Sequence, residues 1–160
     1  FDIIKKKTAS LIASCCASGA ASVSEDVALI EQLRLFGETV GIAFQMRDDL
    51  FDYGSDSDIG KPTGIDIKEK KMTLPLIHAL GNCDRSEKRF IINTIKNYNT
   101  DEERVGKVIE MVRKKGGIDY TVKRMEEYQR QALSMLDGFP ENDSKTSLRD
   151  LVNFVIDRTK

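Results

Sequence analysis

The chain has 160 residues, of which 40% are hydrophobic and 32% are charged, and its formal net charge is −1. This composition is typical of one soluble globular domain, and the near-neutral charge argues against nucleic acid or an acidic membrane as a partner. No apolar run is long enough to span a bilayer. We therefore expect a single domain over residues 1–160 that has no transmembrane segment.

The cysteines and the histidine give no sign of a disulfide or a transition-metal site. Cys15, Cys16 and Cys83 are an odd number, the first two are neighbours, and no Cys-x-x-Cys occurs. We expect them to be reduced and the protein to be cytoplasmic. His78 is the only histidine and has no second metal-binding residue type near it, so we interpret it as structural.

Apolar residues recur at helical spacing along the whole chain, and no strand signal accompanies them. The predicted fold class is all-α, a helical bundle with short connections. A loop rich in Gly, Ser and Asp is expected over 54–66. The predicted helices cover 2–22, 25–53, 74–80, 85–98, 101–115, 118–137 and a final segment after 144.

Small residues in the first two predicted helices mark places where a neighbour can come close. The first helix carries a run of Ala, Ser, Cys and Gly between residues 9 and 21, and the second carries Gly37 and Gly41, four residues apart. Such residues allow close helix packing, or leave room for a slender apolar ligand. Close packing is the interpretation that the residues alone favour.

A cluster of acidic and amide residues closes the second predicted helix. At about 100° per residue, Gln45, Asp48, Asp49 and Asp52 fall within about a third of the helix circumference. Like charges this close repel, and the apolar flanks raise the cost, whereas a divalent cation would remove it. Oxygen ligands without a nearby His or Cys suit Mg²⁺. The alternative is a solvated acidic face without a ligand.

Two other phosphate- or metal-binding patterns fail in the loop after this cluster. An EF-hand that starts at Asp52 would need Gly at its sixth position and Glu at its twelfth, where the chain has Ser57 and Thr63. A Walker pattern is excluded because Lys61 is followed by Pro62.

Several short motifs occur in a fixed order, and together they resemble those of the trans-type polyprenyl diphosphate synthases. This family includes farnesyl, geranylgeranyl and octaprenyl diphosphate synthases. The motifs are Lys7-Thr8-Ala9-x-Leu11, Phe44-Gln45-x-x-Asp48-Asp49-x-x-Asp52, Gly60-Lys61 and Lys71-x-Thr73-Leu74-Pro75.

The resemblance implies a bundle of the isoprenoid synthase type and a role for each matching residue. The acidic cluster corresponds to the second of the family's two aspartate-rich motifs, which holds Mg²⁺ against an allylic diphosphate. The implied metal ligands are Asp48, Asp49 and Asp52. The implied catalytic and diphosphate-binding residues are Lys7, Thr8, Gln45 and Lys61, with Lys71 as a further diphosphate contact. Arg158 and Lys160 resemble the family's basic C-terminal tail.

The implied reaction elongates a polyprenyl diphosphate by condensing isopentenyl diphosphate with an allylic diphosphate. Family members are usually homodimers. The first aspartate-rich motif and the isopentenyl diphosphate site have no counterpart here, and residue 1 is Phe rather than Met. We therefore expect this chain to be the C-terminal half of a longer synthase and to be inactive alone.

Two alternatives share the same fold class. One is a non-catalytic subunit of a heteromeric synthase, or a helical module that only binds Mg²⁺; the retained acidic motif argues against a regulatory subunit. The other is a terpene cyclase or a head-to-head synthase, against which the Lys-Thr and Gly-Lys motifs favour chain elongation. The product length and the allylic primer are not encoded in the residues present.

Overall fold

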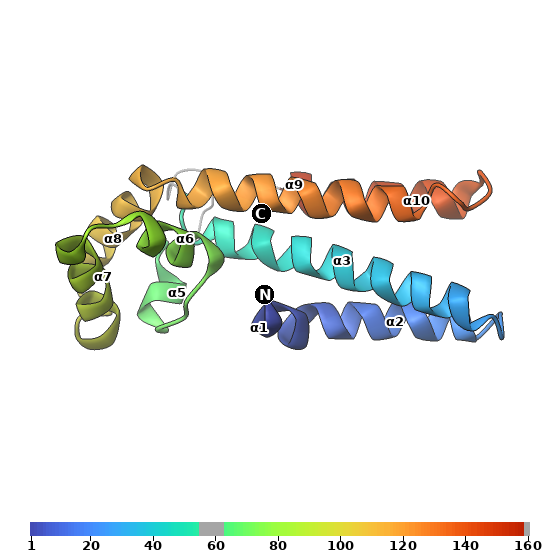
Figure 1. The fold of residues 1–160 in the computed structure, drawn as a ribbon, viewed down its shortest axis with the longest axis horizontal. Coiled ribbons are helices and arrows are strands. Elements are labelled where there is room, and N and C mark those ends of the chain that lie inside the picture. The colour runs from blue at the N-terminus through green and yellow to red at the C-terminus, as the bar shows by residue number, and fades with distance from the viewer. Residues whose placement is uncertain (55–62, 159–160) are drawn as a thin grey trace. The chain divides into compact units, whose positions relative to one another are not determined.

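The computed structural model describes residues 1–54 and 63–158. Across these ranges the secondary structure is helical without strands, which confirms the predicted all-α class (Figure 1). None of the described helices is long and apolar enough to cross a membrane. The elements are α1 (Asp2–Ile4), the π-helical turn η1 (Lys5–Ala9), α2 (Ser10–Ala21), α3 (Val27–Phe51), α5 (Ile65–Lys68), α6 (Leu74–Asn82), α7 (Arg85–Asn97), α8 (Glu102–Lys114), α9 (Gly117–Met135) and α10 (Asp143–Asp157).

Acidic and amide side chains begin several of these helices. Asp84 accepts the backbone N–H groups of Ser86 and Glu87, and the Glu87 carboxylate accepts the N–H of Asp84, which completes a capping box at α7. Asp101 at α8 and Asn142 at α10 each accept one backbone N–H, without the reciprocal bond. Each cap satisfies amide groups that have no partner within the helix and therefore determines where the helix begins.

The described chain divides into two compact units. The first comprises Phe1–Arg47 together with the chain from Arg124 onward, and the second comprises Asp48–Lys123. The boundaries fall within α3 and within α9. The single domain expected from the composition stays a prediction.

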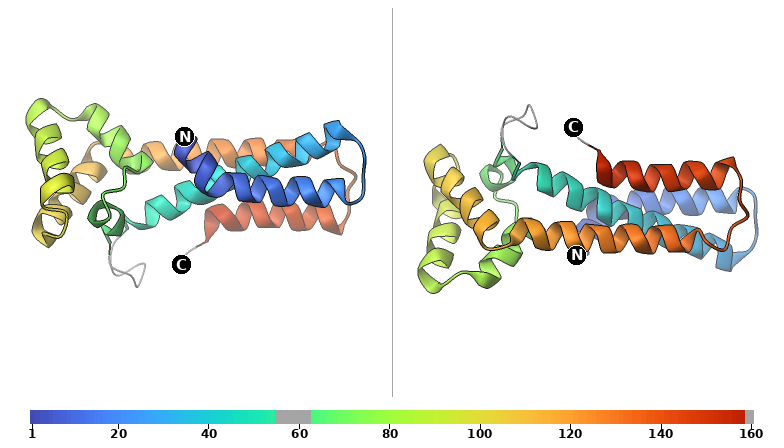
Figure 2. Two further views of the ribbon diagram at one scale, coloured as in Figure 1. Left: turned by 90° about the horizontal axis from the view of Figure 1, so that it is seen from below. Right: turned by 90° about the horizontal axis from the view of Figure 1, so that it is seen from above.

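In the first unit, α2, α10 and the parts of α3 and α9 that belong to it lie side by side (Figure 2). Hydrogen bonds join neighbouring helices: Gln32 Nε2 donates to the carbonyl of Met135 at 2.9 Å, and Gln129 Nε2 donates to Asn153 Oδ1 at 3.1 Å. The buried side chains between these helices are mostly aliphatic. They include Ala13, Phe36, Val40, Ala43, Met46, Met125, Ala132, Leu136, Val152 and Ile156.

The two glycines of α3 have a close neighbour, as the sequence predicted, and this neighbour is the end of η1 together with α2. A Cβ at Gly37 would lie 2.7 Å from the carbonyl oxygen of Ile12, and a Cβ at Gly41 would lie 2.6 Å from the Cα of Ala9. Real Cβ atoms do not approach backbone atoms this closely, so only glycine fits at either position without a shift of the backbone.

The first predicted helix differs from expectation in one turn. The sequence predicts one helix over 2–22, but a π-helical turn separates α1 from α2, with the Ser10 N–H donating to the Lys5 carbonyl. This turn makes polar contacts with α3: Lys5 Nζ lies 2.8 Å from Glu38 Oε1, and Thr8 Oγ1 donates to Gln45 Oε1 at 2.6 Å. These contacts join the π-helical turn to α3.

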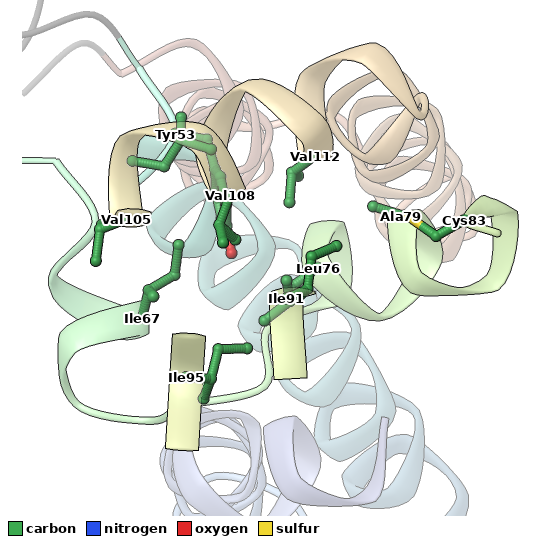
Figure 3. Close-up of a cluster of buried hydrophobic side chains, with 11 residues drawn as sticks. Tyr53, Ile67, Leu76, Ala79, Cys83, Ile91, Ile95, Val105, Val108 and Val112 are labelled. Atoms are coloured by element: carbon green, nitrogen blue, oxygen red, sulfur yellow. The ribbon is translucent and has the colours of Figure 1, made fainter. Parts of the chain in front are cut away.

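The second unit has its own apolar core, drawn in Figure 3. Beside this core, His78 stacks on Tyr120 with ring centroids 4.0 Å apart, and Asn82 Nδ2 lies 3.0 Å from His78 Nε2. These contacts give His78 a packing role. The core residues are Tyr53, Ile67, Leu76, Ala79, Cys83, Ile91, Ile95, Val105, Val108, Ile109 and Val112.

Replacing Gly41 by alanine tests the close packing of η1 and the start of α2 on α3. Overpacking typically costs about 1–3 kcal/mol, against a helix-propensity gain of about 0.5–1 kcal/mol, so we expect Gly41→Ala to lower the free energy of unfolding by about 1–2 kcal/mol. Gly19 of α2 is the matched control, because a Cβ there meets nothing within 4 Å. Gly19→Ala should stabilise slightly. Denaturant unfolding followed by circular dichroism measures both; equal stabilities would contradict the packing argument.

Candidate functional site

The acidic cluster lies at the C-terminal end of α3, and its carboxylates are not splayed into water. Asp49 is 7% exposed, and Asp48 and Asp52 are half-buried. The apolar neighbours Leu50 and Phe51 are both buried. The predicted combination of acidic and buried apolar residues is therefore present at this end of α3.

Asp52 does not lie on the helix face that the sequence predicts for it together with Gln45, Asp48 and Asp49. The sequence predicts a helix that extends to about residue 53, but α3 ends at Phe51. Asp52 instead points its carboxylate at the chain that begins α5: Oδ1 accepts the N–H of Ile65 at 2.7 Å, and Oδ2 accepts the N–H of Asp66 at 3.0 Å. The helical stripe therefore ends with Asp48 and Asp49.

The residues offer a partial fit to a divalent cation. Asp48 and Asp49 provide hard carboxylate oxygens in partly buried surroundings, which suits Mg²⁺. Within residues 1–54 and 63–158, however, no group of three or more His, Cys, Asp or Glu side chains converges closely enough to hold a metal ion. The donor set thus fits Mg²⁺ in its chemistry, whereas the three-carboxylate arrangement implied by the motif is not assembled.

In the first unit, the structure brings together two of the residues predicted to contact diphosphate. Thr8 Oγ1 donates to Gln45 Oε1 at 2.6 Å, and both side chains are half-buried. Lys7 precedes Thr8 on the same π-helical turn and is exposed. π-Helical turns of this kind occur frequently at functional sites. Lys7 therefore offers an accessible ammonium group one residue before Thr8 of the ordered hydroxyl–amide pair.

Arg47 is a notable polar residue that the sequence analysis did not select. Its Nε and Nη2 donate to the carbonyl oxygen of Arg158 at 3.1 and 2.8 Å, which holds the C-terminal end of α10. The Arg158 guanidinium lies 4.0 Å from the ring centroid of Phe44. Burial lowers the pKa of Arg47, and the positive charge of Arg158 lowers it further. The signal in the sequence was that Arg47 is the one charged residue between Val40 and Asp48.

Lys71, a further residue predicted to contact diphosphate, pairs with two carboxylates. Lys71 Nζ lies 3.2 Å from Asp66 Oδ1 and 2.5 Å from Glu69 Oε2, and hydrogen bonds with Glu69 and then Asp66 raise its pKa. Its assignment to diphosphate stays a prediction. Lys61 and Lys160 lie outside the described residues.

Comparison with known proteins gives one consistent family. Residues 1–112 match the family model described as "Polyprenyl synthetase". The chain is 33% identical over 153 residues to heptaprenyl diphosphate synthase component 2 of Geobacillus stearothermophilus, covering 95% of this chain and 47% of that protein. It is 33% identical over 158 residues to a short chain isoprenyl diphosphate synthase of Methanothermobacter thermautotrophicus, covering 98% and 48%.

Solved structures agree with this match. A geranylgeranyl pyrophosphate synthase from Bacteroides thetaiotaomicron superimposes with a TM-score of 0.91 at 35% identity, covering 99% of this chain and 52% of that chain. A polyprenyl synthase from Caulobacter crescentus gives a TM-score of 0.88 at 35% identity, covering 99% and 48%. The chain thus spans about half the length of the curated relatives that it matches.

Replacing Arg47 by methionine tests its hold on the end of α10. Loss of both donors to the Arg158 carbonyl should loosen the last helical hydrogen bond, in which the Arg158 N–H donates to Phe154. We expect amide exchange at Arg158 to become about tenfold faster, the factor that one or two lost hydrogen bonds produce. Arg130→Met removes the same charge from an exposed position on α9 and is the control. Unchanged exchange in Arg47→Met would contradict this role.

Proposed function

The chain belongs to the polyprenyl synthetase family, and we propose that it forms the part of a trans-prenyl diphosphate synthase that binds and ionises an allylic diphosphate. The ionised prenyl group then condenses with isopentenyl diphosphate to lengthen the chain. The observation that carries this proposal is the Thr8–Gln45 pair beside Lys7, within the sequence pattern that the family model matches.

We assign different tasks to the diphosphate-binding residues and to the two carboxylates of the matched motifs. Lys7 and the Thr8 hydroxyl supply donors to the oxygens of the diphosphate, and Gln45 orients that hydroxyl through the 2.6 Å hydrogen bond. Asp48 follows Gln45 by three residues, a spacing that places both on one face of a helix. Asp48 and Asp49 would hold Mg²⁺, and the ion, when bound, would supply positive charge to the phosphate oxygens.

The chemistry explains why these residue types are needed. Cleavage of an allylic C–O bond leaves a carbocation and transfers negative charge to the departing diphosphate. Donors that already point at the diphosphate stabilise this charge as it develops, at no cost of reorganisation. Lys7 carries a full positive charge for that purpose, and Thr8 is held in a defined orientation. The carboxylates position charge and take no part in bond formation.

The assembly in which this chain works is also a proposal. The family resemblance favours a homodimer of the whole protein. Because one relative is named as component 2 of a heptaprenyl diphosphate synthase, a heteromeric synthase is the second candidate. In a homodimer each copy would bind metal through Asp48 and Asp49, and in a heteromeric synthase this chain would be the metal-binding subunit. The masses of complexes formed by the whole protein distinguish the two assemblies.

Binding of inorganic pyrophosphate to the purified chain tests the proposed site. We expect calorimetric titration to detect binding that requires Mg²⁺. Lys7→Gln should weaken it about tenfold or more, because a charge-assisted hydrogen bond is lost, and Asp48→Asn should weaken its dependence on Mg²⁺. Lys88→Gln, at an exposed position on α7, is the control for the loss of charge. Equal affinity in Lys7→Gln and Lys88→Gln would refute the assignment of Lys7.

A further inference from the structure

Three consecutive backbone N–H groups converge on one residue, Asp52. The N–H of Gly64 donates to the backbone carbonyl of Asp52 at 3.0 Å. The next two N–H groups, of Ile65 and Asp66, donate to its carboxylate oxygens at 2.7 and 3.0 Å. Each side-chain oxygen of Asp52 therefore has an amide donor of its own.

The backbone around Gly64 is shaped to make this convergence possible. Gly64 has φ +77° and ψ 17°, in the left-handed region, and the following residues are helical. Successive N–H groups in such a left-handed to right-handed sequence form a concave cradle for a negative charge. A Cβ at Gly64 would also lie 2.6 Å from Val105 Cγ1. Both the backbone conformation and the available space therefore require glycine.

The turn that carries Asp52 is tied to its surroundings on other sides as well. The buried hydroxyl of Tyr53 and the hydroxyl of Thr73, which precedes α6, are 2.7 Å apart. Arg113 of α8 donates from Nε and Nη2 to the carbonyl of Tyr53 at 3.0 and 2.6 Å, and from Nη2 to that of Gly54 at 2.8 Å. The end of α3 is thus fastened to the segments before α5 and α6 and to α8.

We propose that Asp52 is a positioning residue rather than a metal ligand: its carboxylate fills a backbone cradle and fastens the end of α3 to the start of α5. This inference rests on the proposed function, in which Asp48 and Asp49 bind the metal. It contradicts the ligand role that the spacing of the acidic motif implies for Asp52.

The contacts of Asp52 oppose its use as a third metal ligand. Moving its carboxylate toward a cation would break the bonds from Ile65 and Asp66 and would leave their N–H groups without these acceptors. The bond from Asp66 is partly buried, and an N–H group left without an acceptor is costly there. Asp52 also lies beyond the last residue of α3, so helical periodicity no longer aligns it with Asp48. Only Asp48 and Asp49 keep the register that the helix imposes.

Amide exchange and Mn²⁺ binding together test this assignment. In Asp52→Asn, one acceptor becomes a donor that faces a backbone N–H, so we expect exchange at Ile65 and Asp66 to become at least about tenfold faster. Mn²⁺ affinity, measured by electron paramagnetic resonance in the presence of pyrophosphate, should stay within about twofold of the wild-type value. Asp48→Asn should show the opposite pattern, with Mn²⁺ affinity reduced about tenfold and unchanged exchange at Ile65 and Asp66.

Two further measurements keep the test decisive. Gly64→Ala disturbs the cradle without removing a carboxylate, and it should accelerate the same amides while Mn²⁺ affinity stays unchanged. In the wild-type chain, saturating Mg²⁺ and pyrophosphate should leave the protection of Ile65 and Asp66 intact. The inference is overturned if Asp52→Asn lowers Mn²⁺ affinity as much as Asp48→Asn does, or if Mg²⁺ abolishes that protection.

Failure of the proposed function gives a separate result. A wild-type chain that binds no Mn²⁺ with pyrophosphate would refute the metal assignment to Asp48 and Asp49. The exchange rates of Ile65 and Asp66 in Asp52→Asn would still decide whether Asp52 positions the chain after α3, because they are measured without a metal.

Discussion

Negative charge held in partly buried surroundings is the constraint on which the candidate site depends. Asp49 is buried, and Asp48 and Asp52 are half-buried at the end of a helix that carries mostly apolar residues. Burying a carboxylate costs free energy unless hydrogen-bond donors or cations compensate its charge. Backbone amides compensate the negative charge of Asp52. In the proposed function, a cation compensates the negative charge of Asp48 and Asp49. One acidic motif thereby serves two different physical purposes.

Helical periodicity in the sequence predicted most of the fold, and particular residues show why. The predicted all-α class follows from apolar residues that now form the two cores, and Gly37 and Gly41 meet α2 as their spacing indicated. The end of α3 was harder to place. The expected helix included Asp52, but its side chain is captured by amides more than ten residues later in the chain, and no local pattern encodes that contact.

The sequence also predicted part of the candidate site. Thr8 and Gln45 were selected through their family motifs, and they form a hydrogen bond across 37 positions of sequence. Arg47 was overlooked because its partner is a backbone carbonyl, that of Arg158, which any residue type provides. Lys71 was assigned to a ligand alone, although the side-chain carboxylates of Asp66 and Glu69 also contact it. Partners that are distant or are backbone atoms leave no trace in a motif.

The π-helical turn over Lys5–Ala9 has a consequence for how related chains are aligned. A π-turn accommodates one residue more than an α-helical turn, and each residue of a helix rotates the chain by about 100°. A gapless alignment to a relative whose helix is purely α-helical would therefore assign the side chains before this turn to the wrong face of the helix. An alignment to such a relative needs a one-residue gap at the turn, even where the flanking residues align without interruption.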